Sequence, residues 1–198
     1  QIDKDRKSIS SISQSKGLPD TQAWASITDK NNNLWFGTDN GLIKYTKLVK
    51  NLSQKDGLVG FQISSVLADH QKNIWVGAYD GGVSKMDFNN KKVIKYTTKE
   101  GLSNENVISI LEDKEENIWF GTVYSNMFRL NKGGKTFTHY RESGSYVVCI
   151  FEDQAGNIWY SSRDRGEVIR INKTDNSRTH FSPKQGLPHS QVVRIWQD

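Results

Sequence analysis

Asp113-Lys-Glu-Glu-Asn117-Ile-Trp119-Phe-Gly-Thr is the stretch of this sequence that decides the fold. Its pattern, Asp-x-x-x-Asn-[Leu/Ile]-Trp, occurs four times, and the tryptophans Trp35, Trp75, Trp119 and Trp159 are 40, 44 and 40 residues apart. A Gly-Leu pair stands twelve residues before three of the four aspartates, and again before Asp198. Several landmarks that keep one spacing indicate a repeat protein with a unit of roughly 42 residues.

The residue types within the unit favour strands over paired helices. An apolar, β-branched run precedes each aspartate, the Asp-x-x-x-Asn segment suits a tight hairpin, and a second strand follows it. That second strand is apolar on both faces, as in Leu34-Trp35-Phe36, which requires burial on both sides. The sequence therefore predicts an all-β protein, a β-propeller of four-stranded antiparallel blades.

The repeat also predicts the blade boundaries. Four whole blades are expected at residues 23–54, 63–97, 107–140 and 146–182, with partial blades at 8–13 and 191–198. We interpret the chain as an internal excerpt of a longer propeller, or of two in tandem, because both terminal blades lack their middle strands, and a five-blade ring joined from these ends would lack its second and third strands. Its partners would then include the remaining blades of the parent propeller.

The combined motif, Asp-x-x-x-Asn-Ile-Trp-[Val/Phe]-Gly-Thr with Gly-Leu-[Pro/Ser] opening the next unit, resembles the two-component regulator propeller repeat over essentially the whole chain. The resemblance implies a ring of about seven blades in the extracytoplasmic sensor part of a bacterial membrane receptor. It also implies a receptor homodimer, a histidine kinase or diguanylate cyclase output, and a saccharide as the small ligand. The expected location is therefore periplasmic or at the cell surface.

Composition and charge exclude several classes of protein. The 27 basic and 22 acidic residues give a net charge of +5, but the lysines are scattered, so no nucleic-acid partner is expected. No apolar stretch reaches the roughly 20 residues that cross a bilayer. A single cysteine, Cys149, excludes an internal disulfide framework. No cofactor and no metal site is predicted.

We interpret the repeated aspartates and tryptophans as structural. Residues at the same place in every blade point to different regions of space, so the four carboxylates cannot converge on one substrate. Turn stabilisation is expected for the aspartates and inter-blade packing for the tryptophans. The residues concerned are Asp29, Asp69, Asp113 and Asp153, and Trp35, Trp75, Trp119 and Trp159.

Ligand binding is expected where the repeat is broken, on the mouth that gathers loops from every blade. The loops between second and third strands share this mouth with the connections between blades, and both sets diverge in sequence. For Arg194, solvation or local pairing is the favoured interpretation, and holding a carboxylate or a sulfate is the alternative. The candidate residues are Trp24, Asp39, Asn40, Tyr79, Asp80, Tyr124, Asn126, Tyr146, Arg163, Arg165, His189 and Arg194.

The sequence predicts binding rather than catalysis. Its four histidines, His70, His139, His180 and His189, keep no metal-ligand spacing, and Cys149 lies in an apolar run. Two alternatives stay open. One is an enzyme resembling the propeller lyase that linearises streptogramin antibiotics, for which only His189 with Glu105 or Asp164 are candidates. The other is a scaffold module of the cell envelope.

Overall fold

The computed structural model describes residues 22–46, 49–102, 106–124, 126–141, 146–187 and 192–197. Sixteen β-strands and three short 3-10 turns cover most of these residues. The strands are β1 (Ala23–Thr28), β2 (Leu34–Thr38), β3 (Gly41–Tyr45), β4 (Val49–Leu52), β5 (Ile63–Ala68), β6 (Ile74–Ala78), β7 (Gly82–Asp87), β8 (Lys92–Tyr96), β9 (Val107–Glu112), β10 (Ile118–Thr122), β11 (Asn126–Leu130), β12 (Phe137–Arg141), β13 (Val147–Glu152), β14 (Ile158–Ser162), β15 (Glu167–Ile171) and β16 (Arg178–Phe181).

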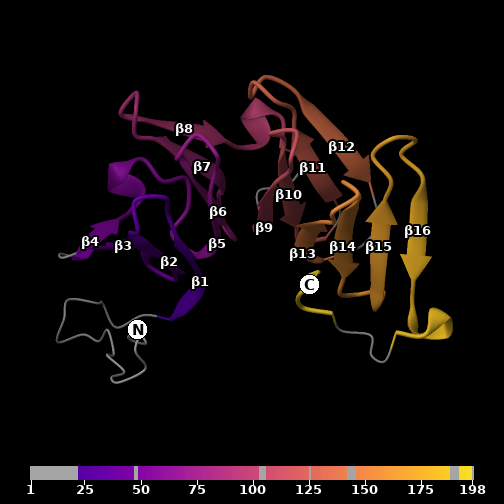
Figure 1. Cartoon of the computed structure of the whole chain (residues 1–198). Helices are drawn as coiled ribbons and strands as arrows, with labels where there is room; N and C mark the ends of the chain where they lie inside the picture. The colour runs from indigo at the N-terminus through magenta and orange to yellow at the C-terminus, as the bar shows by residue number, and fades with distance from the viewer. Residues whose placement is uncertain are drawn as a thin grey trace, which may run out of the picture.

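The strands form four antiparallel sheets of four strands, each in sequence order, which we call blades 1 to 4. The first strands of neighbouring blades, β1, β5, β9 and β13, contact one another, so the sheets fan out from a common centre (Figure 1). This arrangement confirms the predicted all-β propeller fold. No helix in the described part of the chain is long and apolar enough to span a membrane.

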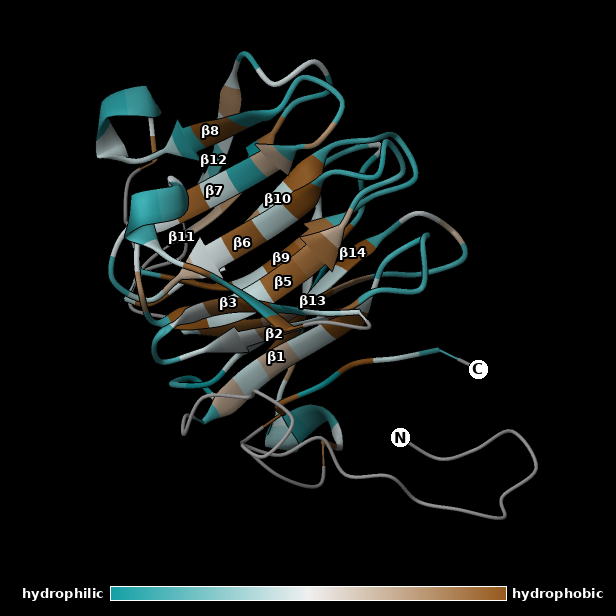
Figure 2. Cartoon of the chain, turned by 90° about the vertical axis from the view of Figure 1, so that its left-hand side faces the viewer, coloured by the Kyte–Doolittle hydropathy of each residue, from teal (hydrophilic) through white to brown (hydrophobic). Residues whose placement is uncertain are grey.

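The hydrophobic core lies between the blades. One cluster joins Trp35 and Leu42 of blade 1 to Ile63 and Val76 of blade 2, and similar clusters join blades 2 and 3 and blades 3 and 4. The middle strands β6 and β10 are buried at every position, as expected of sheets covered on both faces. Figure 2 shows brown bands on these strands and hydrophilic loops around them.

The Gly-Leu pairs mark a capped turn between blades. In blade 2, Thr97 caps the 3-10 turn η3 (Thr98–Glu100), whose Glu100 side chain returns to the Thr97 backbone. Gly101 follows with φ of 107°, a left-handed conformation that favours glycine, and Leu102 is buried. The same turn precedes Gly57 and Gly186, as η2 (Gln54–Asp56) and η4 (Pro183–Gln185). The pair thus ends a turn and sends its leucine toward the core.

Each repeated aspartate holds its own hairpin and the following tryptophan. In blade 3, Asp113 Oδ1 accepts from the Asn117 backbone N–H (2.9 Å), and Asp113 Oδ2 accepts from Trp119 Nε1 (2.8 Å). The same pair of bonds recurs in the other three blades. Because the carboxylate is occupied by these donors, the motif is a structural unit of every blade.

The hairpin carboxylates make the stability of the fold depend on pH. Burial opposes ionisation of Asp29, Asp113 and Asp153, but hydrogen bonds from the asparagine and tryptophan outweigh it and hold each pKa below the ordinary 3.8. A carboxylate whose pKa is lower in the folded than in the unfolded protein stabilises the fold at pH values above its unfolded-state pKa. This stabilisation is lost as the pH falls through the folded-state pKa. We expect the melting temperature to be level from about pH 7 to 5 and to fall below about pH 4. Thermal melts followed by circular dichroism would check this, and a flat profile down to about pH 2 would contradict it.

Neighbouring blades are joined at the hairpins by a repeated bond. The N–H after the aspartate donates to a side chain of the next blade: His70 N to Glu112 Oε2 (2.8 Å) and Lys114 N to Glu152 Oε2 (2.7 Å). Gln154 N donates in the same way to Gln197 Oε1 (2.9 Å). Gln197 is therefore the equivalent of Glu112 and Glu152, the acceptors that the following blade supplies at the other hairpins.

Residues 192–197 nevertheless form no strand, although the sequence predicts a partial blade at 191–198. A first strand obtains its ladder bonds from the second strand of its own blade. Residues 192–197 instead contact β13 through single bonds, such as Ile195 N to Cys149 Sγ (3.3 Å), and no second strand of the described chain pairs with them. The predicted partial blade at 8–13 lies outside the described residues.

Candidate functional site

The loops between second and third strands and the connections between blades lie at one end of the sheets, which we call the mouth. Short bonds fix the two kinds of loop against each other. Tyr79 N donates to Gln62 O (2.8 Å), Val123 N to Asn106 O (3.0 Å) and Arg163 N to Tyr146 O (3.1 Å). Side chains on these loops are therefore presented from a rigid frame.

Two aromatic side chains at the mouth are more than half exposed. Trp24, at the start of β1, is 58% exposed, and its Nε1 donates to Asp39 Oδ1 (2.6 Å). Tyr124 is 61% exposed and has a φ of 70°, a left-handed conformation that is rare for a bulky side chain. Exposed aromatic rings held in place by a bond or by backbone geometry are typical of binding surfaces.

Tyr124 and Tyr146 form a pair on blades 3 and 4. Their ring centroids are 4.9 Å apart and the rings meet edge to face. The hydrogen bond with Tyr124 raises the pKa of Tyr146 to about 12, and Tyr79 and Asp164 add to the shift through their charge. Tyr79 is itself 40% exposed. We call Tyr79, Tyr124 and Tyr146 the tyrosine cluster, which draws on blades 2, 3 and 4.

The remaining mouth candidates are structurally engaged or exposed. Asp80 Oδ1 accepts from the N–H groups of Phe61 and Gln62 (both 3.2 Å), so this carboxylate braces the connection into blade 2. Asn40 N donates to Thr38 Oγ1 (3.2 Å). Arg163 and Arg165 are exposed on the β14–β15 loop, and Arg194 is exposed after blade 4. Asn126 begins β11, its side chain lies outside the described part, and so does His189.

The structure thus places the candidates in two groups. Trp24 with Asp39 forms one on blade 1, and the tyrosine cluster with Asp164 forms the other. Phe61, which is half exposed beside Asp80, joins the mouth although sequence reasoning did not select it as a binding residue. The sequence could have indicated Phe61 as a binding residue, because it is an aromatic residue in a connection between blades.

Among the described residues, no group of three His, Cys, Asp or Glu side chains is placed to hold a metal ion. Of the lyase candidates, His189 and Glu105 lie outside the described part. Of the other histidines, His70 pairs with Glu112, His180 with Glu167, and His139 packs edge to face on Phe128 (5.3 Å). Burial raises the pKa of the Cys149 thiol, which disfavours the reactive thiolate.

The fold and the repeat define a β-propeller with a loop-bearing mouth. The family model of the two component regulator propeller matches residues 17–40, 101–124 and 141–164 of this chain. No curated protein matches the chain by sequence.

Solved structures share the fold at low sequence identity. The extracellular domain of the putative hybrid two component system BT3049 from B. thetaiotaomicron superposes with a TM-score of 0.76 at 19% identity, over 87% of this chain and 26% of that one. A streptogramin B lyase gives 0.71 at 16% identity, over 87% and 57% of the two chains. PorZ of Porphyromonas gingivalis, a surface component of the type-IX secretion system, gives 0.68 at 11%, over 90% and 30%. The chain therefore spans about a quarter of the receptor ectodomain that it resembles.

Proposed function

We propose that this chain is part of the ligand-sensing ectodomain of a bacterial signalling receptor, and that it binds its ligand without catalysis at the mouth. The family match and the likeness to extracellular domains of two hybrid two component systems support this reading. The location would be periplasmic or at the cell surface. The remaining blades of a larger ring and a second receptor copy would be its partners.

The single observation that carries the proposal is the set of exposed aromatic rings at the mouth. Trp24 and the tyrosine cluster offer flat apolar faces, with Asp39 and Asp164 beside them as hydrogen-bond acceptors. Stacking on an aromatic face together with nearby polar groups is how proteins recognise the mixed apolar and hydroxyl surface of a sugar. An oligosaccharide is therefore the ligand that fits this surface best.

Ligand binding would act on the receptor if the ligand has a higher affinity for one arrangement of the receptor than for another. A saccharide that contacts three blades at once favours the arrangement of blades and of receptor copies in which all its contacts form. A tenfold difference in affinity between two arrangements corresponds to about 1.4 kcal/mol. The output would be a histidine kinase or a diguanylate cyclase in the parent receptor. The lyase and scaffold alternatives rest on the fold alone.

Truncation of the mouth aromatics tests the proposal. We expect isothermal titration with cello-, malto-, xylo- and galacturono-oligosaccharides to reveal a ligand, and Trp24→Ala and Tyr124→Ala each to weaken it by about tenfold, because each stacking contact contributes about 1 kcal/mol or more. Trp196→Ala is the matched control, since Trp196 is 74% exposed but lies outside the mouth loops. An equal loss in all three variants, or none in the first two, would refute binding at the mouth.

A further inference from the structure

One position of the repeat differs in chemistry between blades 2, 3 and 4. In blade 2, Ile74 pairs with Met86, and Phe88 follows two residues later. By the same register, Ile118 pairs with Leu130 and Ile158 with Ile171, so the equivalents of Phe88 are Lys132 and Lys173. Each of the three residues follows a third strand.

Two of these three side chains contact the repeated tryptophan or aspartate of the preceding blade. Phe88 packs on Trp35 of blade 1, with ring centroids 5.9 Å apart. Lys173 is nearly buried and reaches Asp113 Oδ2 (3.3 Å) and Glu152 Oε1 (2.9 Å). Asp113 Oδ2 also accepts from Trp119 Nε1 of blade 3. The gap between blades 1 and 2 is therefore closed by a ring, and the gap between blades 3 and 4 by an ion cluster.

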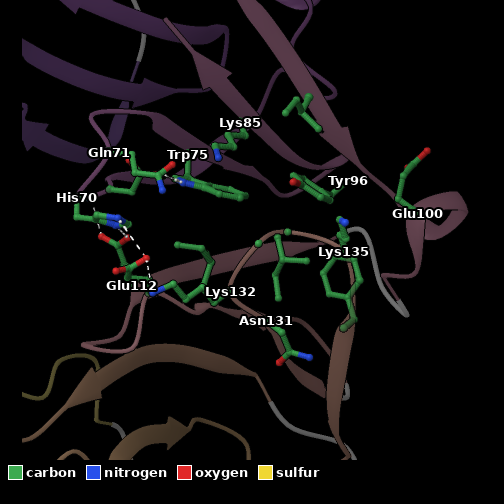
Figure 3. Close-up of a pocket in the computed structure, with 18 of the residues that line it drawn as sticks. His70, Gln71, Trp75, Lys85, Tyr96, Glu100, Glu112, Asn131, Lys132 and Lys135 are labelled. Carbon is green, nitrogen blue, oxygen red and sulfur yellow. Dashed lines mark hydrogen bonds and ion pairs between the residues drawn. The ribbon is translucent and has the colours of Figure 1, made fainter. Parts of the chain in front are cut away.

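The third side chain leaves its space open. Lys132 is directed to Glu116 Oε2 (3.0 Å), and Gly133 and Gly134 follow it without side chains. The result is a groove of about 660 Å³ between the outer parts of blades 2 and 3, away from the mouth aromatics (Figure 3). A volume of this size is typical of small-ligand sites.

The floor of the groove is aromatic and aliphatic. Trp75 and Tyr96 stack with centroids 5.6 Å apart, and Phe137 meets Tyr96 edge to face at 6.0 Å. Ile94 is 38% exposed at its side. The neighbouring gap holds the Phe88 ring against the equivalent tryptophan, so the repeat itself shows that an aromatic ring fits at this place.

The groove is lined by equal numbers of carboxylates and lysines, which are Asp69, Glu100, Glu112 and Glu116, and Lys85, Lys95, Lys132 and Lys135. All four carboxylates have partners: Asp69 accepts from Trp75, Glu100 from the Thr97 cap, Glu112 pairs with His70, and Glu116 pairs with Lys132. Lys85 lies over the Trp75 ring at 5.1 Å, and neither it, Lys95 nor Lys135 forms an ion pair with a carboxylate of the described chain. Figure 3 shows Lys85 and Lys135 on opposite sides of the opening.

We propose that this groove binds a ring-bearing carboxylate, with an aromatic ring in the place that Phe88 fills between blades 1 and 2 and the carboxylate between the free lysines. The ring covers the exposed edges of Tyr96, Ile94 and Phe137. The carboxylate gains charge-assisted hydrogen bonds from Lys85 and Lys135. This site is distinct from the mouth and requires no saccharide there.

Isothermal titration calorimetry with 3-phenylpropionate tests binding in the groove. The uncharged 3-phenylpropanamide is the comparison compound, because it keeps the ring and lacks the carboxylate. We expect saturable binding of the carboxylate with a dissociation constant of about 1 mM or below, and at least about tenfold weaker binding of the amide. Lys132→Phe places in blade 3 the aromatic side chain that blade 2 has at Phe88. This ring should fill the groove and abolish binding. Because the Lys132 ion pair is exposed, this variant should melt at the wild-type temperature or above it.

Charge variants distinguish an effect of the groove lysines on binding from an effect of the protein's overall charge. Lys135→Gln and Lys85→Gln should each weaken 3-phenylpropionate binding several-fold, whereas Lys50→Gln, on the outer strand of blade 1, should leave it unchanged. Glucuronate should bind more weakly, and tighter binding of glucuronate would overturn the choice of an aromatic ring. Absence of saturable binding, equal binding of the amide, or full binding by folded Lys132→Phe would overturn the site itself.

Discussion

Gly121→Ala is expected to lower the free energy of unfolding by about 3 kcal/mol or more, because the added methyl group has no room between blades 3 and 4. A Cβ at Gly121 would meet Ser109 Oγ and the Val147 carbonyl oxygen, and would lie 2.7 Å from Val147 Cγ1. Ser109 Oγ donates to that same carbonyl (2.8 Å), so the methyl group would also break a bond between the blades.

Blade 4 supplies a matched control at the same repeat position. Ser161 stands there in place of glycine, is buried, and its Oγ has no hydrogen-bond partner in the described chain. Ser161→Ala removes a buried unpaired hydroxyl, so its effect should stay within about 1 kcal/mol. Urea unfolding of both variants measures the difference. Equal stability of Gly121→Ala and wild type would show that the blades are not packed as described.

Asp113→Ala is expected to cost about 3 to 5 kcal/mol, because the fully buried carboxylate has partners that would be left without an acceptor. The change leaves the Trp119 indole N–H and the Asn117 backbone N–H unpaired. It also removes one of the two closest carboxylates of Lys173, whose pKa is raised because the bonds with Glu152 and Asp113 outweigh burial.

Asp153→Ala is the matched comparison in blade 4. Asp153 makes the same bonds to Asn157 and Trp159, but it is only half-buried. Its neighbouring lysine, Lys114, donates to the Asp153 backbone carbonyl and not to the carboxylate. Its loss should cost about 1 kcal/mol. Asp113→Asn should fall between the two, because an amide oxygen can still accept from the Trp119 indole. A similar loss of unfolding free energy in Asp113→Ala and Asp153→Ala would show that the ion pair of Asp113 with Lys173 adds no stability.

The repeat made the fold predictable from the sequence. Strand positions follow from landmarks such as Asp113 and Trp119, because each blade repeats one set of local hydrogen bonds and one pattern of burial. Residues 192–197 were harder, since a strand depends on its ladder partner and not only on its own apolar pattern. The β-bulges early in the first strands, as between Ile63 and Ser65, leave no comparable mark in the sequence.

For the candidate binding residues, the sequence could indicate a location but not an arrangement. Broken repeat positions pointed to the mouth loops, and the ring contact of Tyr124 with Tyr146 required the distance between two blades. The groove was not foreseen, because its outline depends on which way Lys132 turns and on what Phe88 and Lys173 do in other gaps. Comparison of equivalent positions across the blades would have been the available signal.

Hydrogen exchange of the backbone amides, with and without the tightest-binding oligosaccharide, tests most directly whether the mouth is the sensing site. We predict slower exchange on ligand addition in the loops at 39–40, 79–81, 123–124 and 163–166, with no change in the hairpins at 29–33, 69–73, 113–117 and 153–157. Protection confined to those hairpins, at the opposite end of the sheets, would contradict a ligand-binding mouth.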